Sequence, residues 1–204
     1  ETTTELLEAI SEYQDTNFRF CAGGSDLLLE LKQQSDGDLT LINIARLSDE
    51  LFTTIQIAED GMRFGSLVTA KDILTNGEIG SRYPVLYQSA NQLASRQIRQ
   101  VATVGGNICT ASPAGDLACA LVALEAYCEI VSTKGSVRTV QLSEFLLGVR
   151  KIDLKKNEIL RSVVIPPHDD ATKTYSDFIK IGTRLSMEIA LVSFGYYIAV
   201  DEEN

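Results

Sequence analysis

The chain has 204 residues, of which 45% are hydrophobic and 23% charged, the composition of a folded globular protein whose core needs no disulfide or metal. With 18 Lys and Arg against 28 Asp and Glu, the formal net charge is −10, which argues against non-specific binding to nucleic acid or to an anionic membrane. The longest apolar run, residues 190–200, is far shorter than the roughly 20 residues of a membrane-spanning helix.

The first part of the chain predicts a strand, a glycine loop and a helix in succession. Thr2 and Glu5 have the spacing of a capping box, and apolar residues follow at helical spacing. Further on, Gly23-Gly24-Ser25-Asp26 separates an apolar strand from a second helix. The predicted elements are a helix over 3–14, a strand over 18–22, a helix over 27–34 and a strand over 39–44.

Turn and cap signals divide the middle of the chain. Gly61 indicates a hairpin turn, Thr69 is placed to cap a short helix, and Pro84 suits the first turn of another. The predicted elements are strands over 52–57 and 62–65, helices over 69–74 and 84–95, and an extended segment over 98–104. A second pair of glycines, Gly105-Gly106, follows that extended segment.

The last part of the chain alternates helices and strands. Asp116 is placed to cap an apolar helix, and Lys134-Gly135 indicates a second hairpin turn. The predicted elements are helices over 116–126 and 142–147, strands over 127–132, 137–140 and 158–165, a linker over 169–172, and strands over 175–181 and 190–200. This order predicts an α+β fold with a boundary near residue 170.

Side chains suited to acid–base or metal chemistry are scarce. His168 is the only histidine and lies in a loop-like stretch, which excludes a Ser-His-Asp triad and a Cys/His zinc site. Cys21, Cys109, Cys119 and Cys128 form no CxxC pair and have apolar neighbours, which indicates buried thiols in a reducing cytoplasm. A bound cofactor is therefore expected to carry any chemistry in which the protein takes part.

Two glycine motifs are the candidate binding elements. Gly23-Gly24 and Gly105-Gly106 each follow a predicted strand, and paired glycines permit positive φ and a close approach of ligand to backbone. Successive amide groups in such a loop form an anion-binding concavity, and a helix that begins directly after the loop favours phosphate. Two such loops suit a pyrophosphate held from both sides, although either pair alone is more simply interpreted as a chain turn.

Four motifs, in their order along the chain, resemble the FAD-binding subunit or domain of the molybdenum hydroxylases, the family of xanthine dehydrogenase and the carbon monoxide dehydrogenase medium subunits. The motifs are AGGSDLL (22–28), ATVGGNICTASPAGD (102–116), EILRSVVIPP (158–167) and KIGTRLSMEIALVSFGYYI (180–198). The resemblance runs over nearly the whole chain.

This resemblance implies the p-cresol methylhydroxylase-type FAD-binding fold, in which two α/β subdomains hold the cofactor between them and an α+β domain follows. We expect the first FAD-binding subdomain over residues 1–58 and the second over 59–170. Residues 171–204 are expected to be the start of a truncated C-terminal domain.

The resemblance also implies which residues contact FAD. The segments 22–27 and 103–107 are expected to wrap the pyrophosphate through backbone amides, and 184–189 to lie near the isoalloxazine ring, with Glu188 where relatives commonly carry Asp. Thr110 and Asp116 match positions that contact the ribityl or diphosphate part. The expected FAD contacts are Ala22, Gly23, Gly24, Ser25, Asp26, Leu27, Leu93, Ala102, Thr103, Val104, Gly105, Gly106, Asn107, Thr110, Asp116, Leu160 and Lys180.

Simpler roles stay open for several of these residues. Asp116 is equally an N-cap of its helix, Thr110 a turn hydroxyl and Lys180 a solvated strand lysine. No catalytic side chain and no metal site is expected in this chain.

The implied function is electron transfer. Electrons would pass from 2Fe-2S clusters on an iron–sulfur partner subunit to the FAD held here and then to NAD or another acceptor, while a molybdopterin subunit hydroxylates the substrate. Neither a nucleic-acid partner nor a membrane span is expected. Two alternatives remain, namely a non-redox scaffold or assembly module of the same fold and a stand-alone flavin oxidase, which would need a substrate-side base and a covering domain.

Overall fold

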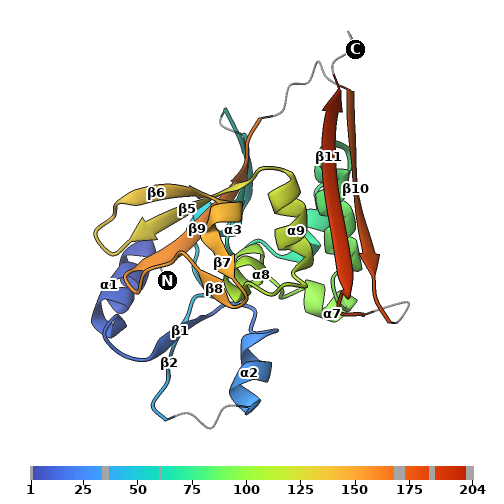
Figure 1. Ribbon diagram of the computed structural model, residues 1–204. Coiled ribbons are helices and arrows are strands. Elements are labelled where there is room, and N and C mark those ends of the chain that lie inside the picture. The colour runs from blue at the N-terminus through green and yellow to red at the C-terminus, as the bar shows by residue number, and fades with distance from the viewer. Residues whose placement is uncertain (1, 34–36, 60, 168–172, 184–186, 201–204) are drawn as a thin grey trace.

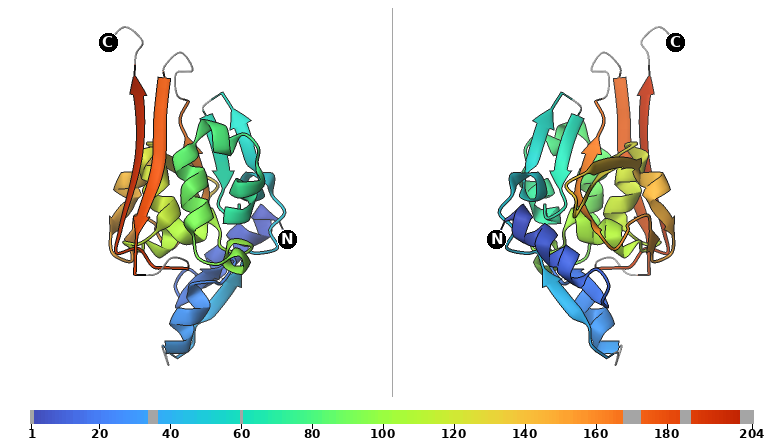
Figure 2. Two further views of the ribbon diagram at one scale, coloured as in Figure 1. Left: turned by 90° about the vertical axis from the view of Figure 1, so that its right-hand side faces the viewer. Right: turned by 90° about the vertical axis from the view of Figure 1, so that its left-hand side faces the viewer.

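The computed structural model describes residues 2–33, 37–59, 61–167, 173–183 and 187–200. They form an N-terminal unit, a central antiparallel sheet flanked by helices, and a long C-terminal hairpin on the opposite side from the N-terminal unit (Figures 1 and 2). His168 and the predicted linker over 169–172 lie outside the described residues.

The N-terminal unit is a strand–helix–strand crossover with a helix before it. Its elements are α1 (Thr3–Tyr13), β1 (Phe18–Cys21), α2 (Leu27–Gln33) and β2 (Thr40–Asn43). The capping box of Thr2 and Glu5 begins α1 as predicted. Strands β1 and β2 pair in parallel, with Phe18 opposite Thr40, so α2 is the crossover between them. The loop 22–26 therefore lies at the carboxyl end of β1.

The central sheet is antiparallel and has a hydrophobic core on each face. Its strands, in spatial order, are β3 (Ile55–Ala58), β4 (Gly61–Gly65), β9 (Glu158–Ile165), β5 (Tyr127–Ser132) and β6 (Val137–Gln141). Successive residues of the middle strand β9 enter different cores, because side chains alternate along a strand. Ile159 packs with Leu6 and Ile10 of α1, whereas Leu160 packs with residues of the helical layer such as Leu121.

Short helices connect the strands, and most of them bury the face of the sheet opposite α1, whereas Phe52, in the first of them, packs in the core on the α1 face. They are α3 (Glu50–Thr53), α4 (Ala70–Thr75), α5 (Ile79–Arg82), α6 (Pro84–Gln92), α7 (Arg96–Arg99), α8 (Val104–Thr110), α9 (Asp116–Ala123) and α10 (Leu142–Phe145), followed by the two-stranded hairpin β7 (Leu146–Gly148) and β8 (Lys151–Ile152). Helices α6 and α9 pack against each other and together carry the C-terminal hairpin.

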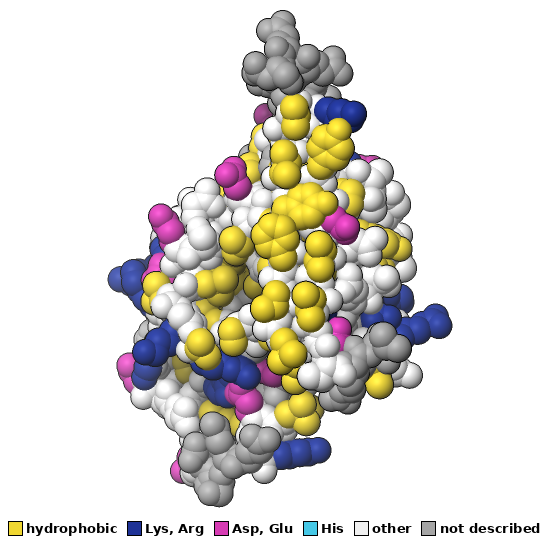
Figure 3. Space-filling view, turned by 45° about the vertical axis from the view of Figure 1, so that its right-hand side comes forward, with side chains coloured by type: hydrophobic (Ala, Val, Ile, Leu, Met, Phe, Trp, Pro, Cys, Tyr) yellow, Lys and Arg dark blue, Asp and Glu magenta, His cyan; other side chains and the backbone are white. Residues whose placement is uncertain are grey.

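The C-terminal hairpin has one covered and one open face. Strands β10 (Lys173–Ile181) and β11 (Val192–Val200) pair antiparallel. On the covered face Phe178 is buried and Gly195 lies against the backbone of Ala120 in α9. The outer face is apolar and exposed (Figure 3), with side chains that include Tyr175, Ile179, Ile181, Val192, Phe194 and Ile198.

Several predicted elements are wrong in type or extent. The segment predicted as a strand over 52–57 starts as helix α3, because the Asp49 side chain accepts from the Leu51 amide, and strand begins only at Ile55. The segment predicted as extended over 98–104 contains the end of α7, a turn and the first residue of α8. The helix predicted over 142–147 ends at Phe145, and β7 begins at Leu146. Helix α5 and the β7–β8 hairpin are additions to the prediction.

The division of the chain after residue 58 stays a prediction, and the hairpin of β3 and β4 spans it. Among the described residues, no helix is long and apolar enough to cross a membrane. The same residues contain no group of three or more His, Cys, Asp or Glu side chains placed to hold a metal ion.

Candidate functional site

The first glycine motif presents a run of unused backbone donors. The strand–loop–helix order predicted for it is confirmed, with β1 ending at Cys21 and α2 beginning at Leu27. Gly24 has φ of +68°, the left-handed conformation that glycine adopts without strain. Within the described part of the chain, the amides of residues 23–27 donate no hydrogen bond, and the first engaged one is that of Leu28, to the Gly24 carbonyl at 3.1 Å. Five consecutive free N–H groups make this loop a candidate anion site.

Gly23 brings this loop against the chain that leads to the second glycine motif. A Cβ placed on Gly23 would lie 1.6 Å from the carbonyl oxygen of Val101, a separation that no side chain tolerates. The two motifs, about 80 residues apart in the sequence, are therefore neighbours in space, as the predicted two-sided pyrophosphate site requires.

The second motif is the first turn of a helix, not a loop after a strand as predicted. Thr103 is the N-cap of α8, and its hydroxyl accepts from the Gly106 amide at 3.0 Å. The other amides of the turn are also engaged: Val104 donates to Val68, Gly105 to Ser66 and Asn107 to Thr103, all at carbonyl oxygens 2.8–3.0 Å away. These four donors are therefore used inside the protein.

The second motif has fewer free hydrogen-bonding groups for a ligand than the first loop. The Asn107 Oδ1 accepts from the Ala118 amide at 3.1 Å. Among the described residues, the Thr103 amide and the Asn107 Nδ2 have no acceptor. Packing alone accounts for a glycine at position 105, because a Cβ there would lie 2.6 Å from the Ser66 Cβ.

Thr110, at the end of α8, touches the first loop directly. Its hydroxyl donates to Oδ2 of Asp26 at 3.3 Å. The guanidinium of Arg150 donates to the same oxygen at 2.8 Å. Burial raises the pKa of Asp26, but the hydrogen bonds and the charge of Arg150 outweigh it, so the carboxyl pKa lies below its ordinary value. Sequence reasoning missed Arg150, which lies in a short turn without a motif.

Asp116 and Lys180 form a buried ion pair. The Lys180 Nζ lies 2.7 Å from Asp116 Oδ2, and the two side chains are 3% and 6% exposed. Asp116 is the first residue of α9 and Gly115 its N-cap, with no side-chain cap bond, so the predicted capping role of Asp116 is wrong. Lys180 is likewise not a solvated lysine. These two predicted FAD contacts lie together although 64 residues separate them.

One oxygen of this pair lacks a partner. Asp116 Oδ1 is buried and accepts no hydrogen bond from any described residue. Burial and the charge of Glu188 together hold the pKa of Asp116 above its ordinary value, although the hydrogen bond and the charge of Lys180 act in the opposite direction. A buried carboxylate oxygen without a donor is costly unless a ligand supplies one.

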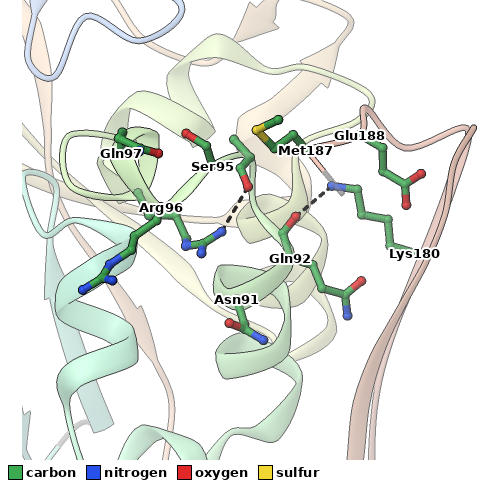
Figure 4. Close-up of a pocket in the computed structure, with 10 residues that line it drawn as sticks. Asn91, Gln92, Ser95, Arg96, Gln97, Lys180, Met187 and Glu188 are labelled. Atoms are coloured by element: carbon green, nitrogen blue, oxygen red, sulfur yellow. Dashed lines mark hydrogen bonds between the residues drawn. The ribbon is translucent and has the colours of Figure 1, made fainter. Parts of the chain in front are cut away.

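A cavity of about 450 Å³ opens beside Lys180 (Figure 4). Lys180 donates to the Gln92 carbonyl oxygen at 3.2 Å, and Arg96 projects from α7 on the other side. Glu188, whose carboxylate lies directly beside Gly182, also lines the cavity. Of the segment expected near the isoalloxazine ring, residues 184–186 lie outside the described residues.

The remaining predicted contacts are apolar and partly or fully buried. Leu27, Leu93 and Leu160 are at most 9% exposed, and Ala22 and Ala102 pack at the margins of the two hydrophobic cores. Their side chains offer packing surface and no polar groups. Cys109, next to the second motif, is a partly exposed residue, and burial of its thiol raises the pKa to about 12.

Comparisons with known protein families match residues 1–168 to the FAD binding domain in molybdopterin dehydrogenase. The nicotinate dehydrogenase FAD-subunit of Eubacterium barkeri is 31% identical over 205 residues, covering 99% of this chain and 68% of that protein. The xanthine dehydrogenase FAD-binding subunit of Escherichia coli O157:H7 is 31% identical over 201 residues, covering 98% and 68%. The chain spans 12% of the xanthine dehydrogenase of Oryza sativa subsp. japonica, to which it is 36% identical over 160 residues.

Solved structures confirm the α+β fold. The reconstituted CO dehydrogenase from Oligotropha carboxidovorans contains a chain with a TM-score of 0.89 at 17% identity, covering 98% of this chain and 68% of that one. Quinoline 2-oxidoreductase from Pseudomonas putida 86 gives a TM-score of 0.82 at 24% identity, covering 94% and 64%.

Proposed function

The chain belongs to the family of FAD-binding domains of molybdopterin dehydrogenases, and from this premise we propose that it is the electron-transferring flavoprotein part of a molybdenum hydroxylase. The observation that carries the proposal is the row of five free amides at residues 23–27 beside the second glycine motif. A diphosphate supplies the anionic acceptors that such a row lacks.

Two features of the chain fit FAD. The free amides of the first loop suit the diphosphate, since backbone N–H groups and the absent side chains of Gly23 and Gly24 permit close approach. The second feature is the buried Asp116 Oδ1, which lacks a donor. The N–H and O–H groups of a flavin nucleotide are donors of the kind that this oxygen requires.

We assign the diphosphate mainly to the first loop. There the amides of residues 23–27 would bind its oxygens, while Thr103 and Asn107 would add an amide N–H and the Nδ2 from the second motif. Leu27, Leu93, Ala22, Ala102 and Leu160 would pack around the cofactor or support the segments that hold it. Asp116 and Lys180 would fix its orientation by hydrogen bonding, and Thr110 would act through Asp26.

The protein's own part in the reaction is binding and electrostatic tuning. FAD, when bound, supplies one- and two-electron redox chemistry, which this chain's side chains lack. Lys180 places a positive charge within the buried pair, and Asp116 and Glu188 place negative charges near it, so these three residues contribute to the electrostatic potential of the cavity. No described residue is proposed as a general acid or base.

We propose that a molybdopterin subunit oxidises the substrate and passes the electrons to 2Fe-2S clusters on an iron–sulfur subunit. From these clusters the electrons would reach the FAD bound by this chain, which would pass them to NAD or another acceptor. The relatives named as FAD subunits of nicotinate and xanthine dehydrogenases support such a heteromeric assembly. A cytoplasmic location is proposed because all four cysteines are free thiols.

The visible absorption spectrum of the purified protein tests the cofactor, followed by identification of what is released on denaturation. A flavin spectrum with FAD as the released compound is expected. A colourless protein that also takes up no added FAD would contradict the proposal and favour a scaffold role.

Rapid-mixing absorption of the assembled complex tests the electron route. After substrate is added, the iron–sulfur absorption and then the flavin absorption are expected to bleach in sequence. Clusters that become reduced while the flavin stays oxidised would contradict the proposed route. Flavin that is reduced by substrate without any partner would instead identify a stand-alone oxidase.

A further inference from the structure

The turn between β7 and β8 is fixed to the end of helix α8. Arg150, in this turn, has φ of +58°, and its amide donates to the Ala111 carbonyl oxygen at 3.0 Å. Ala111 is itself the left-handed residue that ends α8, with φ of +46°. The backbone of Arg150 is thereby anchored to the helix that carries the second glycine motif.

The side chain of Arg150 reaches from this anchor to the first glycine motif. Its Nη1 lies 2.8 Å from Asp26 Oδ2 and 2.8 Å from Glu30 Oε1. Asp26 belongs to the loop with the free amides and Glu30 to the helix that follows it. Glu30 also pairs with Arg19 of β1 at 2.7 Å. Arg150 thus joins α8 to the loop and to the helix after it.

Few apolar contacts hold the first loop and helix α2 in place. Helix α2 projects from the body of the molecule (Figure 1), and Leu28 and Leu29 are more than half exposed. Gly23 packs against Val101 at the start of the loop, and Leu27 is buried at its end. Between these two residues, the partners that Asp26 finds outside the loop and α2 are Thr110 and Arg150.

Charge gives Arg150 a second effect. Asp26 and Glu30 place two carboxylates next to amides that would receive a diphosphate, and like charges repel. The Arg150 guanidinium neutralises part of this negative charge. Because its side chain is 48% exposed, the pairs add little to folding stability, so the effect falls on ligand binding more than on unfolding.

We infer that Arg150 is a positioning residue, which holds the loop 22–27 in its binding conformation through Asp26 and Glu30 and offsets their charge. The inference rests on the proposed binding of FAD at this loop. A loop already held in its bound shape loses less conformational entropy on binding, so removal of the clamp should weaken binding of the diphosphate.

Titration of the intact protein with FAD and with riboflavin, which lacks the diphosphate, tests this inference. Arg150→Gln is expected to weaken FAD binding by about tenfold with riboflavin affinity and melting temperature nearly unchanged. Lys151→Gln is the matched control, since it removes the same charge from an exposed neighbour on the same hairpin, and it should leave the FAD affinity within about twofold.

A second substitution separates positioning from direct contact. In an Arg150→Gln background, Asp26→Asn is expected to restore part of the FAD affinity, because it removes the charge that Arg150 no longer offsets. If the losses of FAD affinity measured in the two single variants simply add in the double variant, Arg150 would be a direct diphosphate ligand and the inference would be overturned. FAD affinity unchanged in Arg150→Gln would overturn it while the proposed function stands, whereas a parent protein without FAD affinity would overturn both.

Discussion

The ammonium of Lys180 lies 2.7 Å from Oδ2 of Asp116, and this contact joins the C-terminal hairpin to the first turn of α9. Both side chains are buried, and the second carboxylate oxygen, Oδ1, has no donor among the described residues. A buried ion pair with an unused oxygen adds little stability for its cost in desolvation. Its presence is explained if a ligand completes it.

Asp116→Asn is expected to weaken FAD binding by about tenfold or more and to leave the protein folded, because the amide oxygen still accepts from Lys180. Flavin fluorescence titration and a thermal melt measure the two effects. The double variant Asp116→Leu with Lys180→Met, which removes both charges together, is expected to fold and to bind weakly. Parent-like FAD affinity in both variants would exclude the pair from the site.

Gly24→Ala is expected to weaken FAD binding by about tenfold or more, since an alanine at φ of +68° strains the loop and its Cβ meets the Leu28 side chain at 3.2 Å. Gly135→Ala is the matched control, because Gly135 also has positive φ, +77°, but no neighbour within 4 Å. Titration of both variants with FAD separates the effect of the site from that of strain. Equal affinities would mean that the loop conformation does not matter for binding.

Gly105→Ala is expected to lower the free energy of unfolding by about 1–3 kcal/mol, because its Cβ would overlap the Ser66 Cβ. Gly77→Ala, at a glycine with open space around it, is expected to change stability much less. Denaturant unfolding of the two variants provides the measurement. A stable Gly105→Ala protein that has lost FAD would show instead that this glycine serves the ligand.

Acid is expected to destabilise the central sheet through Glu129. Burial raises the pKa of this carboxyl, but hydrogen bonds from Arg63 and Ser162, with the charges of Arg63 and Arg161, lower it to about 2, from an ordinary 4.5. Since the pKa is depressed in the folded state, the stabilisation is complete above pH 4.5 and is lost as the pH falls toward 2.

Glu129→Gln is accordingly expected to lower stability at pH 7 by about 3 kcal/mol, because it leaves two arginines without their carboxylate, and to flatten the acid dependence. Thermal melts between pH 2 and pH 7 test this, with exposed Glu8→Gln as the control for loss of one carboxylate. A parent-like acid profile in Glu129→Gln would place the acid transition elsewhere.

Local sequence patterns predicted the first glycine motif because its flanks carry unambiguous signals, an apolar strand before Ala22 and an apolar helix after Asp26. The second motif was misjudged because two adjacent glycines are poor helix formers, which hid a helix start that the Thr103 hydroxyl stabilises. Asp49 and Ser95 are caps of the same kind, and they account for the helices missed at α3 and α7.

Contacts between residues far apart in the sequence could not be predicted from local sequence patterns. The pairing of Asp116 with Lys180 and that of Arg150 with Asp26 depend on how the elements pack, and no spacing rule connects residues so far apart. Family resemblance supplied Asp116 and Lys180 as candidates, whereas Arg150 emerged only from the arrangement of the β7–β8 turn. The use of the second motif's amides inside the protein likewise became visible only in three dimensions.

Residue-resolved amide hydrogen exchange, with and without FAD, tests most directly whether the free amides of the first loop hold the diphosphate. The amides of residues 23–27, unbonded within the chain, are expected to exchange fast without FAD and to become protected when it binds. Those of residues 104–107 already donate within the protein and are expected to change little. Fast exchange at residues 23–27 in the FAD-bound protein would contradict binding of the diphosphate by this loop.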